Sequence, residues 1–266
     1  MQKRHKDRRQ YFEEQSITTE KYVIPFIEKS IPITKNTLVL EIGCGEGGNL
    51  FPFIEKGCIV TGVDMNANKI KNANLFYANY TETNKPTFVL TDIYDWETDQ
   101  KFDVIMLRDV LEHIHNQEKF LKFVKKFLKP DGKLFLGFPP WQNPYGGHQQ
   151  MFDSTIARLP FIHLLPTKLY TWILRKLKES EKEIEAIVEI KETRITIERF
   201  YKIIRDQNYT ISNSTFYFIN PNYEIKFGLK PRKQLRIITK IPWLRNFLIT
   251  TCYVTLETRT KQTKNE

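Results

Sequence analysis

Residues 38–49 read Leu-Val-Leu-Glu-Ile-Gly-Cys-Gly-Glu-Gly-Gly-Asn, and this stretch decides the fold. A short apolar run meets a glycine cluster, and the next apolar run, residues 59–64, ends in Asp64. A strand, a glycine turn and a carboxylate about 20 residues further on are typical of the nucleoside-binding half of a Rossmann-type sheet. Gly43 and Gly45 carry no Cβ, so they permit a sharp turn close to a ligand. We expect the Asp64 carboxylate to accept hydrogen bonds from ribose hydroxyls.

The glycine spacing alone leaves two classes of ligand open. A dinucleotide site has the pattern Gly-x-Gly-x-x-Gly or Ala, and Gly48 completes that pattern when it is read from Gly43. Spacing therefore does not exclude NAD. Read from Glu41, the pattern is instead Glu-x-Gly-x-Gly-x-Gly, and Glu41 inside the strand favours a different nucleoside ligand.

Three further segments continue the alternation of strands and helices. Residues 87–93 are predicted to form a third strand that ends near Asp92, and residues 102–108 a fourth. Residues 109–114 are expected to open the next helix. Pro130 and Gly132 then mark the turn into a fifth strand.

In this order and spacing, the segments resemble class I S-adenosylmethionine-dependent methyltransferases, in the broad group that holds the ubiquinone and menaquinone enzymes. The resemblance covers residues 36–140 well and residues 195–258 as a pattern. It implies an α/β fold with a Rossmann-like, doubly wound sheet of about seven strands and an antiparallel last strand inserted between its neighbours. It also implies S-adenosylmethionine as the cofactor and S-adenosylhomocysteine as the product.

The resemblance carries a set of cofactor-binding residues onto this chain. Met65 would cover one face of the adenine, Asp92 and Ile93 would flank it, and Arg108 would lie near the methionyl end. The full predicted set is Glu41, Gly43, Cys44, Gly45, Asp64, Met65, Asp92, Ile93 and Arg108.

We predict one methyltransferase domain over residues 1–266. Within it, residues 1–35 form an N-terminal helical segment, 36–138 the cofactor-binding core, 139–195 an inserted lid and 196–258 the C-terminal part of the sheet. The lid is expected to be mainly helical, with a helical segment over about residues 154–188. Because ligands of open α/β sheets bind at the carboxyl ends of the strands, an insertion after the fifth strand should shape the acceptor pocket.

Residues for the acceptor chemistry are predicted less sharply. His148, beside Gly146 and Gly147, is the first candidate for a base, because a neutral imidazole titrates near neutral pH. His113 and His115 are its rivals. Trp141 and Tyr145 offer an apolar face and a polar tip, and are candidates to line the acceptor site. For each of these residues, a purely structural role in packing or loop hydrogen bonding is the alternative.

A metal is not predicted, although one alternative is open. Asp109, Glu112 and His113 are spaced i, i+3 and i+4, which on a helix would put them on one face. They resemble the Glu-x-x-Glu-His run on which ubiquinone-type O-methyltransferases place a divalent metal, with the shorter Asp109 in the first position.

Composition limits the setting of the protein. The net charge of +10 is typical of a solvated surface or of a protein that meets anionic partners. The segments 168–178 and 226–245 interleave basic with apolar or aromatic residues, which fits peripheral contact with an anionic membrane or with phosphorylated intermediates. The three cysteines lack paired spacing, and the charged first residues do not resemble a secretion signal. We therefore expect a cytoplasmic protein, with peripheral contact at the inner membrane face as an open alternative.

The predicted function is methyl transfer to a small-molecule acceptor. A hydroxyl is the expected acceptor group, on a quinone-, lipid- or glycan-like molecule. Two alternatives remain: a nucleic-acid (RNA) methyltransferase, which the charge permits although no RNA-binding module is present, and a non-catalytic protein that binds the cofactor. The oligomeric state and the identity of the acceptor stay open.

Overall fold

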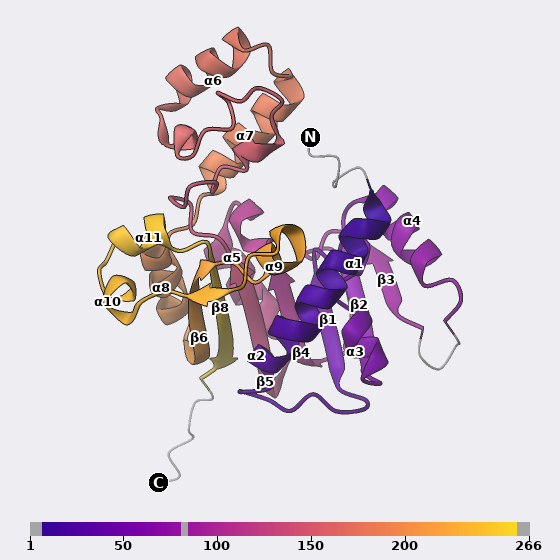
Figure 1. The fold of residues 1–266 in the computed structure, drawn as a ribbon. Coiled ribbons are helices and arrows are strands. Elements are labelled where there is room, and N and C mark those ends of the chain that lie inside the picture. Colours follow the sequence, from indigo (N-terminus) through magenta and orange to yellow (C-terminus); the bar gives the residue numbers. More distant parts are fainter. Residues whose placement is uncertain (1–6, 81–84, 260–266) are drawn as a thin grey trace.

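The computed structural model describes residues 7–80 and 85–259, and its centre is a mixed sheet (Figure 1). The eight strands lie in the order β3-β2-β1-β4-β5-β8-β6-β7. Their bounds are β1 (Leu38–Ile42), β2 (Ile59–Asp64), β3 (Thr87–Leu90), β4 (Phe102–Arg108), β5 (Leu128–Phe138), β6 (Tyr209–Ile219), β7 (Arg232–Lys233) and β8 (Thr251–Thr258).

The strand directions confirm the predicted topology. Strands β1 to β5 pair in parallel, whereas β8 runs antiparallel to both β5 and β6 and lies between them. The last strand is therefore inserted between its neighbours, as the resemblance implies. The count reaches eight because a two-residue strand, β7, pairs with β6 at the edge.

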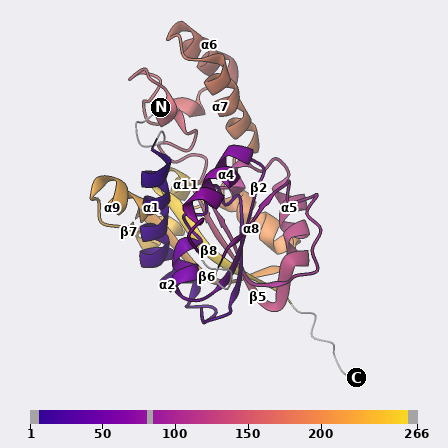
Figure 2. The same ribbon diagram turned by 90° about the vertical axis from the view of Figure 1, so that its right-hand side faces the viewer.

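Helices cover both faces of the sheet (Figure 2). One face packs against α1 (Arg8–Thr18), α2 (Ile24–Ile27), α3 (Phe51–Glu55) and α4 (Ala67–Phe76). The other packs against α5 (Gln117–Val124) and α8 (Ile197–Asp206). The remaining helices are α6 (Thr167–Lys176), α7 (Glu181–Thr193), α9 (Asn222–Phe227), α10 (Arg236–Thr239) and α11 (Leu244–Leu248).

Local sequence explains where these helices begin. The side chain of Asn66 accepts from the backbone N–H groups of Asn68 and Lys69, which caps α4, and Thr196 caps α8 in the same way through Arg199. None of the helices among the described residues is both long and apolar enough to cross a membrane.

The inserted lid stands above the end of the sheet at which β4 and β5 finish (Figure 1). Where the chain enters and leaves the lid, the backbone N–H of Trp141 donates to the carbonyl of Ile195 over 2.8 Å. This hydrogen bond joins the two connecting segments. The lid has its own small apolar cluster, formed by Phe152, Ala157, Tyr170, Leu174, Ile184 and Ile187.

The first part of the lid contains less helix than the sequence predicts. Residues 154–166 form turns and one short 3₁₀ turn, Ile162–Leu164, before α6 begins at Thr167. Pro160 and Pro166 explain this, because proline removes a backbone donor and clashes with the preceding turn of a helix. The prediction of a helix from about residue 154 is wrong for this part.

Candidate active site

The glycine loop joins β1 to α3 at the carboxyl edge of the sheet. Gly43 and Gly45 have φ of +72° and +56°, a conformation that favours glycine. A Cβ on Gly43 would lie 2.7 Å from Cγ2 of Val110, so this glycine lets the loop pack against the segment after β4. A Cβ on Gly45 would meet only Cδ of Lys69 at 3.9 Å, so the loop is open to a ligand there.

Asp64 lies at the tip of β2 and faces this loop. One of its oxygens accepts from the backbone N–H of Gly45 over 2.8 Å, and the other accepts from that of Asn66 over 2.8 Å. Each carboxylate oxygen keeps acceptor capacity for a further donor. Met65 follows immediately and is 69% exposed, so its side chain is free to cover a flat ligand.

The next strand edge holds the other predicted adenine neighbours. Asp92 is half-buried and accepts from the backbone N–H of Tyr94 over 2.9 Å. Ile93 is buried in the core cluster on the α5 and α8 face of the sheet.

Behind the loop, Glu41 and Arg108 belong to one buried network. Oε1 of Glu41 accepts from the Asn49 side-chain amide over 2.7 Å, and Oδ1 of Asn49 accepts from Arg108 over 2.8 Å. Burial raises the pKa of Glu41 to about 8, with partial compensation from Asn49 and Arg108. Oε2 of Glu41 has no hydrogen-bond partner among the described residues, so this network can still accept a donor from a ligand.

Cys44 contributes backbone rather than side chain to the loop. It is buried, and its Sγ lies 2.7 Å from the position of a Cβ on Gly62, so the thiol packs against β2. Burial raises its pKa well above the ordinary value, which makes it a poor nucleophile. All three cysteines of the chain are free and buried.

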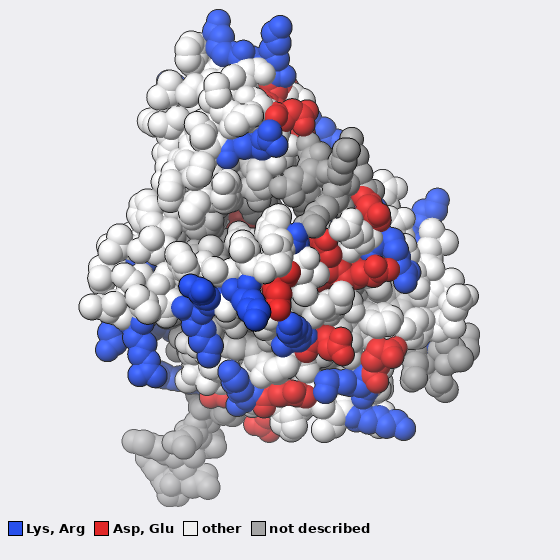
Figure 3. Space-filling view, viewed as in Figure 1, with Lys and Arg blue, Asp and Glu red and all other residues white. Residues whose placement is uncertain are grey.

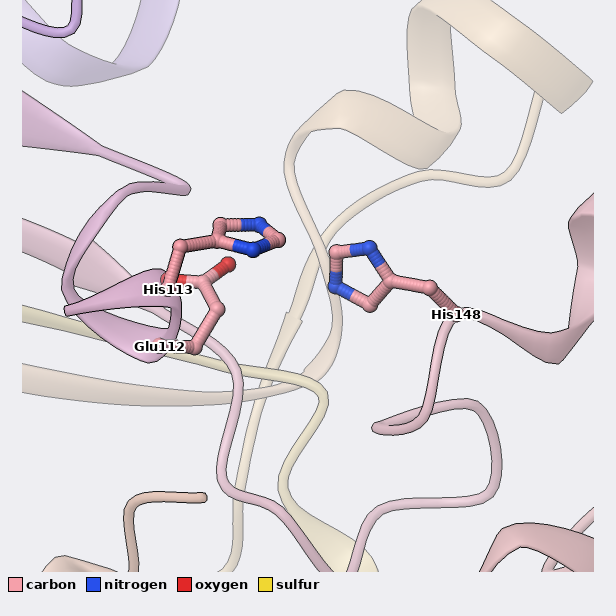
Figure 4. Close-up of side chains that lie close together, drawn as sticks. All are labelled: Glu112, His113 and His148. Atoms are coloured by element: carbon pink, nitrogen blue, oxygen red, sulfur yellow. The ribbon is translucent and has the colours of Figure 1, made fainter. Parts of the chain in front are cut away.

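A second group of polar residues lies at the same edge of the sheet. Ligand atoms of Glu112, His113 and His148 all lie within 4.8 Å of one another. Figure 4 shows His148 reaching from its loop toward the turn that carries the other two side chains. The two imidazole rings meet edge to face, with centroids 5.1 Å apart. We call these three residues the Glu-His-His cluster.

Asp109 does not join this cluster. Residues 111–113 form a single 3₁₀ turn rather than an α-helix, and Asp109 precedes it with φ of +55°. Its carboxylate is instead 3.9 Å from Nε of Arg108. The predicted sharing of one helix face by Asp109, Glu112 and His113 is therefore wrong, and His148 takes the third place.

The electrostatics of the cluster favour the neutral forms of Glu112 and His113. Glu112 is 4% exposed and neither carboxylate oxygen has a partner among the described residues. Burial, together with the charge of Asp109, raises the pKa of Glu112 well above its usual value. Desolvation also lowers the pKa of His113, although the residue as a whole is exposed. At neutral pH, His113 is therefore a free base.

The lid holds the cluster from behind. The hydroxyl of Thr193, at the end of α7, donates to the backbone carbonyl of Glu112 over 2.5 Å. The side-chain amide of Gln117 donates to the carbonyl of Thr193 over 2.7 Å. The turn that carries Glu112 and His113 is thus fastened to the base of the lid.

Of the two aromatic candidates, Trp141 is engaged elsewhere. It is 6% exposed, its ring packs edge to face on His163 at 4.7 Å, and its carbonyl contacts Nε2 of His163 at 2.9 Å. The structure therefore favours a packing role for Trp141 over one in the acceptor site. Tyr145 is 39% exposed and remains available to a ligand.

Two tyrosines at the site escape sequence analysis. Burial raises the pKa of Tyr11 on α1 to about 12, and that of Tyr223 on α9 in the same direction. The charge of Asp109 contributes to both shifts and Tyr145 to the second, so both hydroxyls lie within electrostatic range of the Asp109 carboxylate. No local pattern around either tyrosine marks it, because the two helices come from opposite ends of the chain.

The residues present fit the expected groups. The open space beside Gly45, the exposed Met65 and the free oxygen of Glu41 fit a nucleoside with a polar amino-acid end. One carboxylate and two imidazoles are also a donor set that suits a divalent transition metal.

Comparison with known proteins identifies the family. Residues 19–159, just over half of the chain, match the model of a methyltransferase domain. The ubiquinone biosynthesis O-methyltransferase of Coxiella burnetii (strain Dugway 5J108-111) is 32% identical over 162 residues, which cover 56% of this chain and 66% of that relative. The enzyme of the same name from Rickettsia typhi (strain ATCC VR-144 / Wilmington) is 29% identical over 111 residues, 42% of this chain and 44% of that relative. The matched stretches thus span less than two thirds of these relatives.

Solved structures agree on the fold. Magnesium protoporphyrin IX methyltransferase (ChlM) from Synechocystis PCC 6803, with bound SAH, aligns with a TM-score of 0.52 at 15% identity, over 90% of this chain and 81% of that one. The same enzyme with bound SAM aligns with a TM-score of 0.51. The predicted fold is confirmed. The chain belongs to the methyltransferase domain family, with the class I fold of S-adenosylmethionine-dependent enzymes.

Proposed function

We propose that this protein transfers the methyl group of S-adenosylmethionine to a hydroxyl of a small-molecule acceptor that is quinone-, lipid- or glycan-like. The observation that carries the proposal is the Glu-His-His cluster, which places two imidazoles next to the cofactor loop. Gly43 packs against Val110, two residues before Glu112, so the loop and the cluster are neighbours. The name of the matched relatives supports an oxygen acceptor.

The cofactor, when bound, supplies a methyl group already activated by the positive sulfur. The protein then has to bind it and align the acceptor. Asp64 would accept from the ribose, the Gly45 backbone would lie against the nucleoside, and the Glu41–Asn49–Arg108 network would hold the methionyl end. Arg108 is buried, donates to the side-chain oxygens of Asn49 and Thr19 and has the Asp109 carboxylate 3.9 Å from its Nε, and a ligand carboxylate would add a second charged partner.

We assign the removal of the hydroxyl proton to the imidazole pair. His113 is neutral at physiological pH and therefore able to accept a proton. His148 contacts it and offers a second nitrogen to the same acceptor. Tyr145 is the aromatic side chain that we propose to line the acceptor pocket.

The test of cofactor binding is a calorimetric titration with S-adenosylhomocysteine, beside NADH. Wild type should bind the first ligand and not the second, and Asp64→Ala should weaken binding at least about tenfold through loss of a charged hydrogen bond. Preferential binding of NADH would overturn the proposal.

The test of methyl transfer uses labelled S-adenosylmethionine and a panel of catechol-type and polyprenyl phenols. His113→Gln should lower kcat about 10²-fold or more while leaving S-adenosylhomocysteine binding unchanged. The same measurement on His148→Gln shows how much the second imidazole contributes to kcat. Binding without transfer to any acceptor in the panel would favour the non-catalytic alternative.

The same cluster supports a second role, as a holder of a divalent metal. Glu112, His113 and His148 would be the ligands, and a bound cation would make the acceptor hydroxyl easier to deprotonate. Metal analysis of the purified protein, before and after a chelator, separates the two roles. If the chelator removes both a bound metal and the activity, and the Glu112→Gln variant holds no metal, the cluster is a metal site. If the protein keeps full activity in the chelator, the imidazoles act as the general base.

A further inference from the structure

An apolar and basic surface lies over α10 and α11, next to β6 and β7 at one edge of the sheet. It is formed by the exposed side chains of residues 229–248, which include α10 and α11, and we call it the α10–α11 surface. We infer that the α10–α11 surface docks on an anionic lipid bilayer. The inference does not depend on the acceptor or on the role of the histidines.

The apolar part of this surface is large for an exposed segment. Trp243 is 61% exposed and Ile237 is 69% exposed. The other exposed apolar side chains are Leu229, Leu235, Ile241, Leu244, Phe247 and Leu248. A contiguous run of such residues marks a surface that meets an apolar partner. Tryptophan in particular suits the boundary between lipid and water, because its ring is apolar and its N–H is polar.

The charges of the surface have a single sign. No Asp or Glu occurs between Glu224 and Glu257 in the sequence. Lys230, Arg232, Lys233, Arg236 and Lys240 are all exposed, and none forms an ion pair within the described ranges 7–80 and 85–259. In Figure 3, the left-hand part of the molecule over α10 and α11 is white, with blue side chains beside it. Long basic side chains next to apolar ones can reach lipid head groups while the apolar groups insert.

The surface is held in shape by the core. Asn246 is fully buried, accepts from the backbone N–H of Ile197 and donates to Glu198 over 2.6 Å. Glu198 also accepts from the backbone N–H of Trp243 and from Arg245. These bonds keep Trp243 at φ of +65°, a costly conformation for a large side chain, with its ring toward solvent. The exposed ring is therefore presented by a fixed turn and not by a frayed loop.

The surface continues onto the lid beside the acceptor site. The ring of Phe161 in the lid lies 6.3 Å from that of Phe247 in α11. The backbone N–H of Phe161 donates to the carbonyl of Pro144, next to Tyr145 and four residues before His148. A bilayer on the α10–α11 surface would thus lie near the mouth of the proposed acceptor site.

A bilayer fits this surface better than nucleic acid does. Nucleic acid binding relies on basic side chains along a face, with aromatic rings for stacking. Here, branched aliphatic side chains such as Ile237 and Leu235 are the most exposed, and they have no favourable contact with phosphates or bases. An anionic bilayer suits both kinds of side chain, because its head groups attract the basic residues and its hydrocarbon interior accepts the aliphatic ones.

The test is flotation of the full chain with vesicles of phosphatidylcholine, alone or with about one third phosphatidylglycerol, at about 0.1 M salt. Wild type should float with the anionic vesicles only. Ile237→Ser with Trp243→Ser should reduce the bound fraction, and Arg232→Glu with Lys233→Glu and Arg236→Glu should lower the partition coefficient at least about tenfold.

A matched control comes from α4, where Leu75 is 62% exposed and Lys71 is exposed one turn earlier. Leu75→Ser with Lys71→Glu should float as wild type does. Calorimetric binding of S-adenosylhomocysteine by every variant shows that each has folded. The inference fails if wild type does not float with anionic vesicles, if the α10–α11 variants float as well as wild type, or if RNA displaces the protein from the vesicles.

Discussion

Gly43 and Gly228 allow backbone strain at positive φ to be distinguished from the steric clash of an added Cβ. Both have positive φ, +72° and +69°, but a Cβ on Gly43 meets Val110 at 2.7 Å whereas one on Gly228 meets nothing within 4 Å. Gly43→Ala should lower the free energy of unfolding by about 2–4 kcal/mol, and Gly228→Ala by about 1 kcal/mol. Urea denaturation measures both. Equal losses would show that the contact with Val110 is unimportant.

Glu112 should make stability depend on pH. Its folded pKa lies well above the ordinary 4.5, so between these two values the folded protein holds a proton that the unfolded chain has released. The free energy of unfolding therefore falls as pH rises above about 4.5. Glu112→Gln removes this contribution, so the variant should gain stability relative to wild type between about pH 5.5 and pH 8 in the presence of a chelator.

Urea titrations at the two pH values check this prediction. Glu41 contributes a fall of the same sign, because burial raises its pKa to about 8, but it is common to both proteins and cancels in the comparison. Glu185→Gln, at an exposed position of α7, is the control and should parallel wild type. A pH dependence in Glu112→Gln identical to that of wild type would contradict the assignment.

At the scale of elements, the junction between α7 and the 3₁₀ turn Leu111–His113 fastens the lid to the site. Thr193→Val keeps the shape of the side chain but leaves the Glu112 carbonyl without its hydroxyl donor. We expect a loss of about 1–2 kcal/mol and faster amide exchange at the end of α7. Thr171→Val, whose hydroxyl bonds only within its own exposed helix, should change neither. Unchanged exchange in Thr193→Val would show that other contacts hold the lid.

For the whole molecule, the separate apolar cluster of the lid predicts that it opens independently of the sheet. Leu174→Ala removes a fully buried side chain from that cluster and should cost the lid about 2–5 kcal/mol. Amide exchange in α6 and α7 should then accelerate while that of β1 and β4 stays slow. S-adenosylhomocysteine binding should persist. Cooperative loss of both would mean that lid and core are one folding unit.

The cofactor half of the site was open to prediction because its residues are close in sequence. Glu41, Gly43 and Asp64 lie within one strand–turn–strand unit, where backbone geometry alone brings them together. Thr196 and Asn66 likewise mark helix starts by a local hydrogen bond. The acceptor half was predicted less well. Asp109, expected beside Glu112 on a helix, is excluded by the left-handed turn after β4.

The fold class and the cofactor loop followed from local patterns of apolar residues, glycines and strand ends, whereas the inserted last strand followed from the resemblance to the methyltransferase family. The packing of distant segments, by contrast, brings His148 to Glu112 and His113 and turns apolar side chains of α10 and α11 outward. Those contacts join segments far apart along the chain. They arise from how the lid and the C-terminal strands pack on the sheet, and no periodicity in the sequence records that packing.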